Sequence, residues 1–168
     1  MTNPKPSPQP TRYTTLEFLS VCSPGVREMY EHWLELRGGR VLPFRSDFDP
    51  ARIKRHLPSI MLVDVQWEPL DFVYRLVGTR EAETRGYDPT GRRVADAFFA
   101  NSAEHALDNY RYVAMEKSVL YDCESVSVPG NRYVGDESVF LPFTLGGERV
   151  DQILVYSHCE DLWLKPVR

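Results

Sequence analysis

Residues 60–93, IMLVDVQWEPLDFVYRLVGTREAETRGYDPTGRR, carry the pattern that decides the fold. Two apolar runs rich in β-branched residues, Ile60–Gln66 and Asp71–Gly78, are separated by the four residues 67–70. Runs of this length around a four-residue connection are typical of a β-hairpin. The second run ends at Gly78, where a strand can bend sharply because glycine has no Cβ. We therefore predict a hairpin followed by short, glycine-punctuated connections.

Further elements are predicted on either side of the hairpin. Three more strands are expected downstream: Val119–Val128, Val139–Leu145 and Val150–Cys159. Between them and the hairpin, residues 79–85 and 93–99 read as short helices. A longer helix is expected from a Ser102 cap to about Lys117, with its apolar residues on one side.

A helix upstream of the hairpin carries a continuous apolar stripe. Ser23 and Pro24 form a helix start, and Gly38 forms a helix end. The stripe recurs at helical spacing and comprises Val26, Met29, Tyr30, Trp33 and Leu34. Such an apolar stripe must be buried, either against the outer face of the chain's own sheet or against the same helix in a second subunit. We predict a homodimer with contacts from Met29, Tyr30, Trp33 and Leu34, and with Trp33 as the anchor.

The order of these elements and several short motifs resemble a PAS domain. The motifs are Leu36-Arg37-Gly38-Gly39-Arg40, Leu57-Pro58, Tyr74-Arg75-Leu76-Val77-Gly78-Thr79 and Thr90-Gly91-Arg92. More narrowly, the chain resembles the stand-alone PAS-type family known mostly from alphaproteobacteria. The resemblance implies an α+β fold, with a five-stranded antiparallel sheet, helices on one face and an N-terminal helical extension. It also implies the strand order second, first, fifth, fourth, third.

The expected division of the chain follows from these elements. Residues 1–13 form a proline-rich, disordered tail, 14–58 the helical extension, 59–160 the PAS-like core and 161–168 a C-terminal tail. A length of 168 residues suits one domain. The sequence contains neither a signal-peptide core nor an apolar run of about 20 residues, so we predict a cytoplasmic protein without membrane contact. A net charge of −4 argues against general nucleic-acid binding.

Metal, haem and flavin sites are not expected from the sequence. His32, His56, His105 and His158 are scattered, and no pair has ligand spacing on one element. His105 lies early on the predicted long helix, from which haem-binding PAS domains supply a ligand, but its polar neighbours favour a surface histidine. The Asn-Cys-Arg-Phe-Leu-Gln pattern of the flavin-binding light sensors does not occur. The sequence therefore leaves the identity of any cofactor open and disfavours haem and flavin.

The resemblance implies a ligand pocket between the sheet and the helices. Its candidate residues are Tyr74, Arg75, Phe98, His105, Tyr110, Tyr121 and Phe143. Packing alone is the alternative explanation for each aromatic residue. For Arg75 the alternative is a surface position or an ion pair with a carboxylate, because an unpaired buried arginine is costly.

These observations predict a sensory or signalling module without catalysis. It would bind a small organic molecule and pass the signal by contact with a separate effector protein, because the sequence contains no recognisable output domain. The sequence has neither a Gly-x-Ser-x-Gly elbow nor a phosphate-binding glycine loop, so no enzyme is expected. A ligand-free dimerisation or adaptor module is the main alternative, and an enzyme on the same scaffold is a more distant one.

Overall fold

The computed structural model describes residues 11–128 and 132–161, and these residues form one antiparallel sheet of six strands. In spatial order the strands are β1 (Thr11–Tyr13), β4 (Leu120–Val128), β5 (Arg132–Phe143), β6 (Gln152–Asp161), β2 (Ile60–Gln66) and β3 (Asp71–Val77). The order from β3 to β4 is the one predicted from the resemblance. The predicted hairpin is β2 and β3, which pair directly.

Strand β1 lies at the end of the segment that was predicted to be a disordered tail, residues 1–13. It pairs with β4, from Thr11 opposite Cys123 to Tyr13 opposite Tyr121. The prediction is wrong for these three residues because the open edge of β4 supplies backbone hydrogen-bond partners. Residues 1–10 and 162–168, which make up the rest of both predicted tails, lie outside the described residues.

Two sequence-based boundaries differ from the structure. Strand β5 begins at Arg132 instead of Val139. The apolar pattern does not reveal its first half, because polar residues such as Asp136 and Ser138 take the buried positions there. Residues 93–99 do not form the predicted helix. The backbone of this segment hydrogen-bonds to the open edge of β3 instead, with Val94 N donating to Phe72 O and Tyr74 N donating to Arg92 O.

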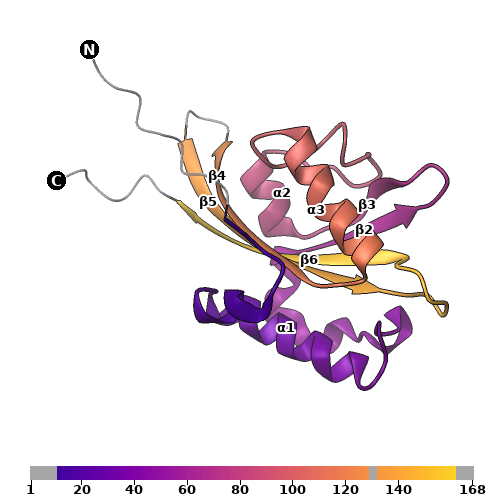
Figure 1. Ribbon diagram of the computed structural model, residues 1–168. Coiled ribbons are helices and arrows are strands. Elements are labelled where there is room, and N and C mark those ends of the chain that lie inside the picture. Colours follow the sequence, from indigo (N-terminus) through magenta and orange to yellow (C-terminus); the bar gives the residue numbers. More distant parts are fainter. Residues whose placement is uncertain (1–10, 129–131, 162–168) are drawn as a thin grey trace, which may run out of the picture.

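Helices cover both faces of the sheet (Figure 1). Helix α1 (Pro24–Arg37) lies on the outer face, together with the 3₁₀ helices η1 (Leu16–Ser20), η2 (Arg45–Asp47) and η3 (Pro50–Ser59). Helices α2 (Thr79–Arg85) and α3 (Ala103–Glu116) lie on the inner face. Among the described residues, no helix is long and apolar enough to cross a membrane.

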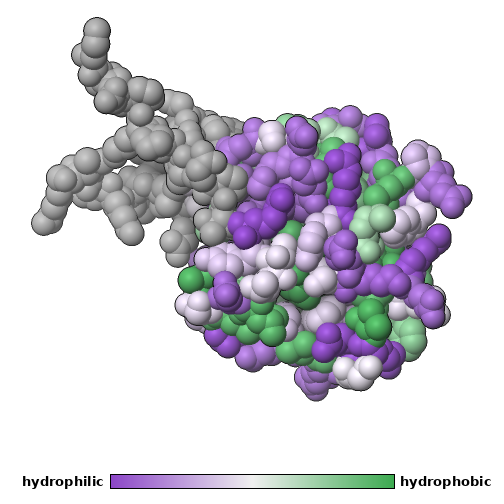
Figure 2. Space-filling view, in the orientation of Figure 1, coloured by the Kyte–Doolittle hydropathy of each residue, from purple (hydrophilic) through white to green (hydrophobic). Residues whose placement is uncertain are grey.

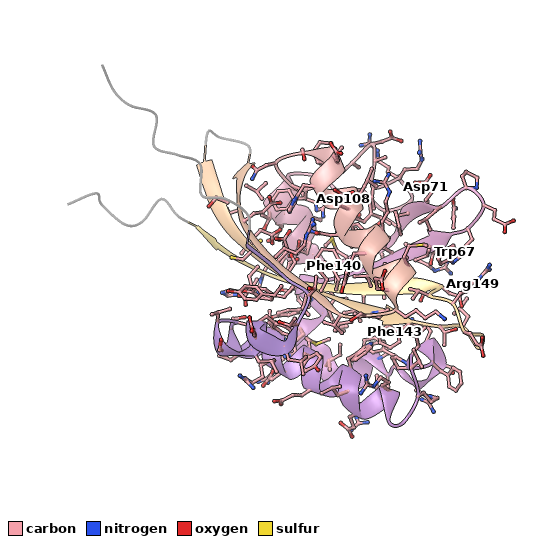
Figure 3. All side chains as sticks on the ribbon, in the orientation of Figure 1. Trp67, Asp71, Asp108, Phe140, Phe143 and Arg149 are labelled. Carbon is pink, nitrogen blue, oxygen red and sulfur yellow. The ribbon has the colours of Figure 1, made fainter. Side chains whose placement is uncertain are left out.

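The sheet therefore separates two hydrophobic cores, and alternate residues of β2, β4, β5 and β6 enter different cores. In β5, Phe140 packs in the inner core with Tyr110 of α3, and Phe143 packs in the outer core with Phe48. Figure 3 shows these two phenylalanines on opposite sides of the sheet.

The apolar stripe of α1 is covered by the chain's own sheet. Met29, Tyr30 and Trp33 are buried in the outer core, and Leu34 is partly buried against it. The indole Nε1 of Trp33 donates a hydrogen bond of 2.8 Å to the carbonyl oxygen of Pro142 in β5. Intramolecular packing, the alternative to a dimer contact, thus already covers these side chains. The homodimer itself stays a prediction, and a contact through Trp33 would require α1 to leave the sheet.

We expect Trp33→Ala to lower the free energy of unfolding by about 3–5 kcal/mol, because it leaves a cavity in the outer core and an unpaired buried carbonyl oxygen. Urea denaturation measures the loss. Met115→Ala is the control, since Met115 is 62% exposed on α3, and it should cost less than about 0.5 kcal/mol. Equal losses in the two variants would contradict the packing of α1 on the sheet.

A second stability prediction concerns Gly78, which follows β3. A Cβ at this position would overlap the backbone carbonyl oxygens of Leu57 and Pro58, whereas a Cβ at Gly39 would meet nothing within 4 Å. Gly78→Ala should therefore cost about 1–3 kcal/mol of unfolding free energy through overpacking. Gly39→Ala should change it by less than about 1 kcal/mol. Thermal melts of the two variants test the difference, and similar melting temperatures would argue against the close approach of η3 to Gly78.

Candidate functional site

A small cavity lies in the inner core, between the sheet and helices α2 and α3. Its volume is about 30 Å³, which is room for one or two water-sized groups. The polar residues that line it are Tyr74, Arg85, Asn109, Tyr110, Asp122, Glu124, Asp136 and Ser138. We call this set the polar chamber. A flavin or porphyrin ring does not fit a space of this size.

Strand alternation places the acidic residues of the polar chamber. In β4, Asp122 and Glu124 share the inner face, while Tyr121 and Cys123 between and beside them belong to the outer core. In β5, Asp136 and Ser138 share the inner face in the same way. Pairing of Glu124 with Asp136 across the two strands brings the carboxylates together.

The cation of the polar chamber is Arg85, at the end of α2. Its side chain is buried, with an exposed fraction of 6%. Nη1 donates hydrogen bonds of 3.2 Å to the hydroxyl of Tyr74 and to the carbonyl oxygen of Ala97. The guanidinium also stacks over the ring of Tyr74 at 4.9 Å from the centroid. These contacts hold the charge in place, and no carboxylate in the described part of the chain forms a direct salt bridge with Arg85.

Three carboxylates in and beside the polar chamber, those of Glu124, Asp136 and Glu81, have raised pKa values, mainly because burial disfavours their charged form. The pKa of Glu124 is raised to about 7: burial is the largest cause, the negative charge of Asp122 adds to the rise, and His105 opposes it. Burial also raises the pKa of Asp136 to about 6. Burial, together with the negative charge of Asp136, raises the pKa of Glu81 on α2 to about 8. Protonation of these groups is therefore coupled to the folded structure near neutral pH.

One corner of the polar chamber contains a histidine. His105, in the first turn of α3, places Nε2 2.6 Å from Oδ2 of Asp122 and 3.9 Å from Oε2 of Glu124. Asn109, one turn later on α3, donates a hydrogen bond of 2.7 Å from Nδ2 to the same Asp122 oxygen. Asn101 donates from Nδ2 to Oε2 of Glu124 at 3.1 Å. The corner thus joins α3 to β4 by polar contacts.

The structure brings together only part of the pocket predicted from the sequence. Tyr74 and Tyr110 line the polar chamber, and His105 contacts its wall through Asp122. Arg75 is exposed and pairs with Asp64 at 3.4 Å, and Phe98 is 37% exposed. Tyr121 and Phe143 lie in the outer core, on the other face of the sheet. The sequence-based prediction includes Tyr121 and Phe143 in the pocket because the sequence alone does not show which face of β4 and β5 turns inward.

Sequence reasoning missed the acidic residues and Arg85. Asp122 and Glu124 alternate in a run that otherwise reads as a strand, and two acidic residues on one face of a strand were the signal that could have revealed them. No motif with a fixed spacing predicts that His105 contacts these acidic residues, because Asp122 lies 17 residues after His105 in the chain. That contact exists only after α3 has packed on the sheet.

Comparisons with known proteins agree with this architecture. The family described as PAS domain matches residues 21–155 of the chain. Among solved structures, the chain is similar to one titled "Structure of an RNA-binding Light-Oxygen-Voltage Receptor", with a TM-score of 0.55 and 17% identity. That likeness covers 92% of this chain and 39% of the other, so this chain spans about two fifths of its length. No curated protein matches the chain.

The family match extends from just before α1 into β6, and it thus includes α1, the hairpin, α2, α3 and nearly all of the sheet. The solved structure shares the fold, at an identity too low to carry a function. PAS domains are typically sensory or signalling modules. From the family match and the antiparallel sheet with its helices, we conclude that this chain belongs to the PAS-domain family.

Proposed function

We propose that this PAS domain receives a signal as a change of charge in the polar chamber and passes it on by contact with a separate effector protein. The observation that carries the proposal is the small buried chamber that several carboxylates line together with one buried arginine. Charges in such a site interact strongly, because the interior screens them far less than water does. A proton or a small ion that enters the chamber therefore changes the energy of every element that lines it.

The two helices of the inner face are the elements through which such a change would reach the surface. Helix α2 contributes Arg85, and α3 contributes Asn109 and Tyr110. Each helix also carries side chains on the surface, with Glu83 on α2 and Glu116 on α3 among the exposed ones. A shift of either helix would thus alter a surface that a partner can contact.

The size of the polar chamber limits the ligand. The small organic molecule expected from the sequence needs more than the 30 Å³ available, unless α3 moves away from the sheet. We therefore propose an input of one or a few atoms. The proposal includes no catalysis, because a chamber of this size has no room for an organic substrate beside its polar residues.

An adaptor without a ligand is the second function considered, because the inner core is nearly filled. Such a module needs a contiguous apolar surface. Among the described residues, the large exposed hydrophobic side chains are spread over the domain: Leu16, Val21, Val41, Leu76, Tyr87, Phe98, Met115 and Leu145. Figure 2 shows hydrophobic residues in several small groups between hydrophilic ones. The distribution favours the sensory role over the adaptor.

The first test removes one charge from the polar chamber. At one pH unit above the Glu124 pKa of about 7, Glu124→Gln should slow amide hydrogen exchange in α2 and α3, because repulsion among the carboxylates of β4 and β5 decreases. Mass spectrometry of the metal-free chain measures the exchange. Glu116→Gln makes the same chemical change on the exposed face of α3 and should leave exchange in α2 unchanged. Wild-type exchange rates throughout α2 and α3 of a folded Glu124→Gln variant would reject the proposal.

The second test is the dependence of stability on pH. Because the folded-state pKa of Glu124 is raised above 4.5, the folded state binds more protons than the unfolded state up to pH about 7. The free energy of unfolding should therefore fall as pH rises through this window, by at most about 1.4 kcal/mol per pH unit for this group. Asp136 adds to the fall between its ordinary pKa of 3.8 and about 6.

Urea denaturation at a series of pH values measures this dependence. Glu124 faces His105 on α3, Asp122 on its own strand and Asp136 on β5, and Glu124→Gln should flatten the slope that these neighbours produce. The Glu116→Gln control should keep the wild-type slope. A free energy of unfolding that rises between pH 5 and pH 7 would contradict the raised pKa values.

A further inference from the structure

The histidine corner of the polar chamber has the donor set of a metal site. His105 Nε2 and one carboxylate oxygen each from Asp122 and Glu124 all lie within 4.8 Å of one another. The three side chains come from two different elements, α3 and β4, so the packing of the domain fixes their arrangement. A cation between them would replace the 2.6 Å contact of His105 with Asp122, and the two atoms would separate to about 3.4 Å around a tetrahedral ion with bonds near 2.1 Å.

Two buried oxygen atoms at this corner need a partner. Oδ1 of Asn109 and Oδ1 of Asp122 have no hydrogen-bond partner among the described residues. Asn109 is 3% exposed and Asp122 is 5% exposed, and both line the cavity. Buried acceptors of this kind are rare in folded proteins because leaving them unpaired is costly. Asn109 and Asp122 thus offer further acceptor oxygens beside the histidine corner.

The charge of the polar chamber also calls for a cation. Asp122, Glu124 and Asp136 line the cavity with one arginine, Arg85. Three carboxylates against one guanidinium leave an excess of negative charge when all are ionised, and either protonation or a bound cation removes such a buried excess. A divalent ion would cancel that excess. A water molecule would satisfy the oxygens and leave the charge unchanged.

We infer that His105, Asp122, Glu124 and Asn109 bind one divalent transition-metal ion at the α3–β4 corner of the polar chamber. One imidazole nitrogen with carboxylate and amide oxygens suits ions such as Zn²⁺ and Mn²⁺. Ca²⁺ takes six to eight oxygen ligands, and Mg²⁺ keeps several waters, for which the cavity has no room. The inference rests on the proposed function, since it names the chemical class of the signal that enters the chamber.

The test measures binding of ZnCl₂ and MnCl₂ to the full chain, freed of metal by a chelator, in equilibrium dialysis. We expect one ion per chain, and at least tenfold weaker binding in His105→Gln and in Asp122→Asn. His56→Gln is a matched control, because His56 Nε2 also lies 2.6 Å from a carboxylate oxygen, that of Glu28, on the outer face. It should bind like the wild type. Absence of saturable binding, or equal losses in His56→Gln and His105→Gln, would overturn the inference.

A measurement on the wild type alone covers the case in which the variants fail to fold. Mn²⁺ broadens the NMR signals of nuclei close to it. At one equivalent of MnCl₂, the amide signals of residues 105–109 and 121–125 should broaden before those of α1. Broadening centred on Glu28 and His56 instead would refute the site.

The two proposals can fail separately. If no ion binds but Glu124→Gln still slows exchange in α2 and α3, the metal site is wrong and the charge-sensing role stands. If one ion binds at His105 and exchange in both helices stays the same, the metal site stands and the sensing role is wrong.

Discussion

Both faces of the sheet are covered, and the two cores depend on this constraint. Because α1 lies on one face and α2 with α3 on the other, alternate residues of β4, β5 and β6 enter different interiors. The outer interior is apolar and rich in stacked aromatic rings, such as Phe18 on Tyr121 at 5.3 Å. The inner interior is apolar toward β2 and β3 and becomes charged toward β4 and β5. One strand can thus serve packing on one side and chemistry on the other.

The charged part of the inner core is costly to fold, which is why it suggests a function. Burial of Glu81, Glu124 and Asp136 opposes their ionisation, and one arginine does not balance these carboxylates together with the buried Asp122. A core built only for stability would place apolar residues there. Clusters of buried groups with shifted pKa values are more frequent at functional sites than elsewhere. A PAS domain that responds to a proton or an ion would use this imbalance as its sensing element.

Two histidine–carboxylate pairs show how environment decides what a contact can do. His56 with Glu28 and His105 with Asp122 have the same separation of 2.6 Å. Glu28 is 45% exposed, so water screens the first pair and its contribution is small. Asp122 is 6% exposed at its side chain and lies beside a second carboxylate and an unpaired amide oxygen. Only the second pair stands among groups that could hold a cation.

The sequence by itself determined the local elements, because their signals are local. Alternation and β-branched residues defined β2 from Ile60 to Gln66, the Ser23 cap and Gly38 bounded α1, and residues 79–85 form α2 as predicted. Motifs supplied the family and the strand order. Only the tertiary structure decided that Asp122 and Glu124 turn inward, that His105 meets them, and that the sheet covers Trp33. These outcomes depend on which face of each strand and helix is buried, and that choice is made by packing between segments far apart in the chain.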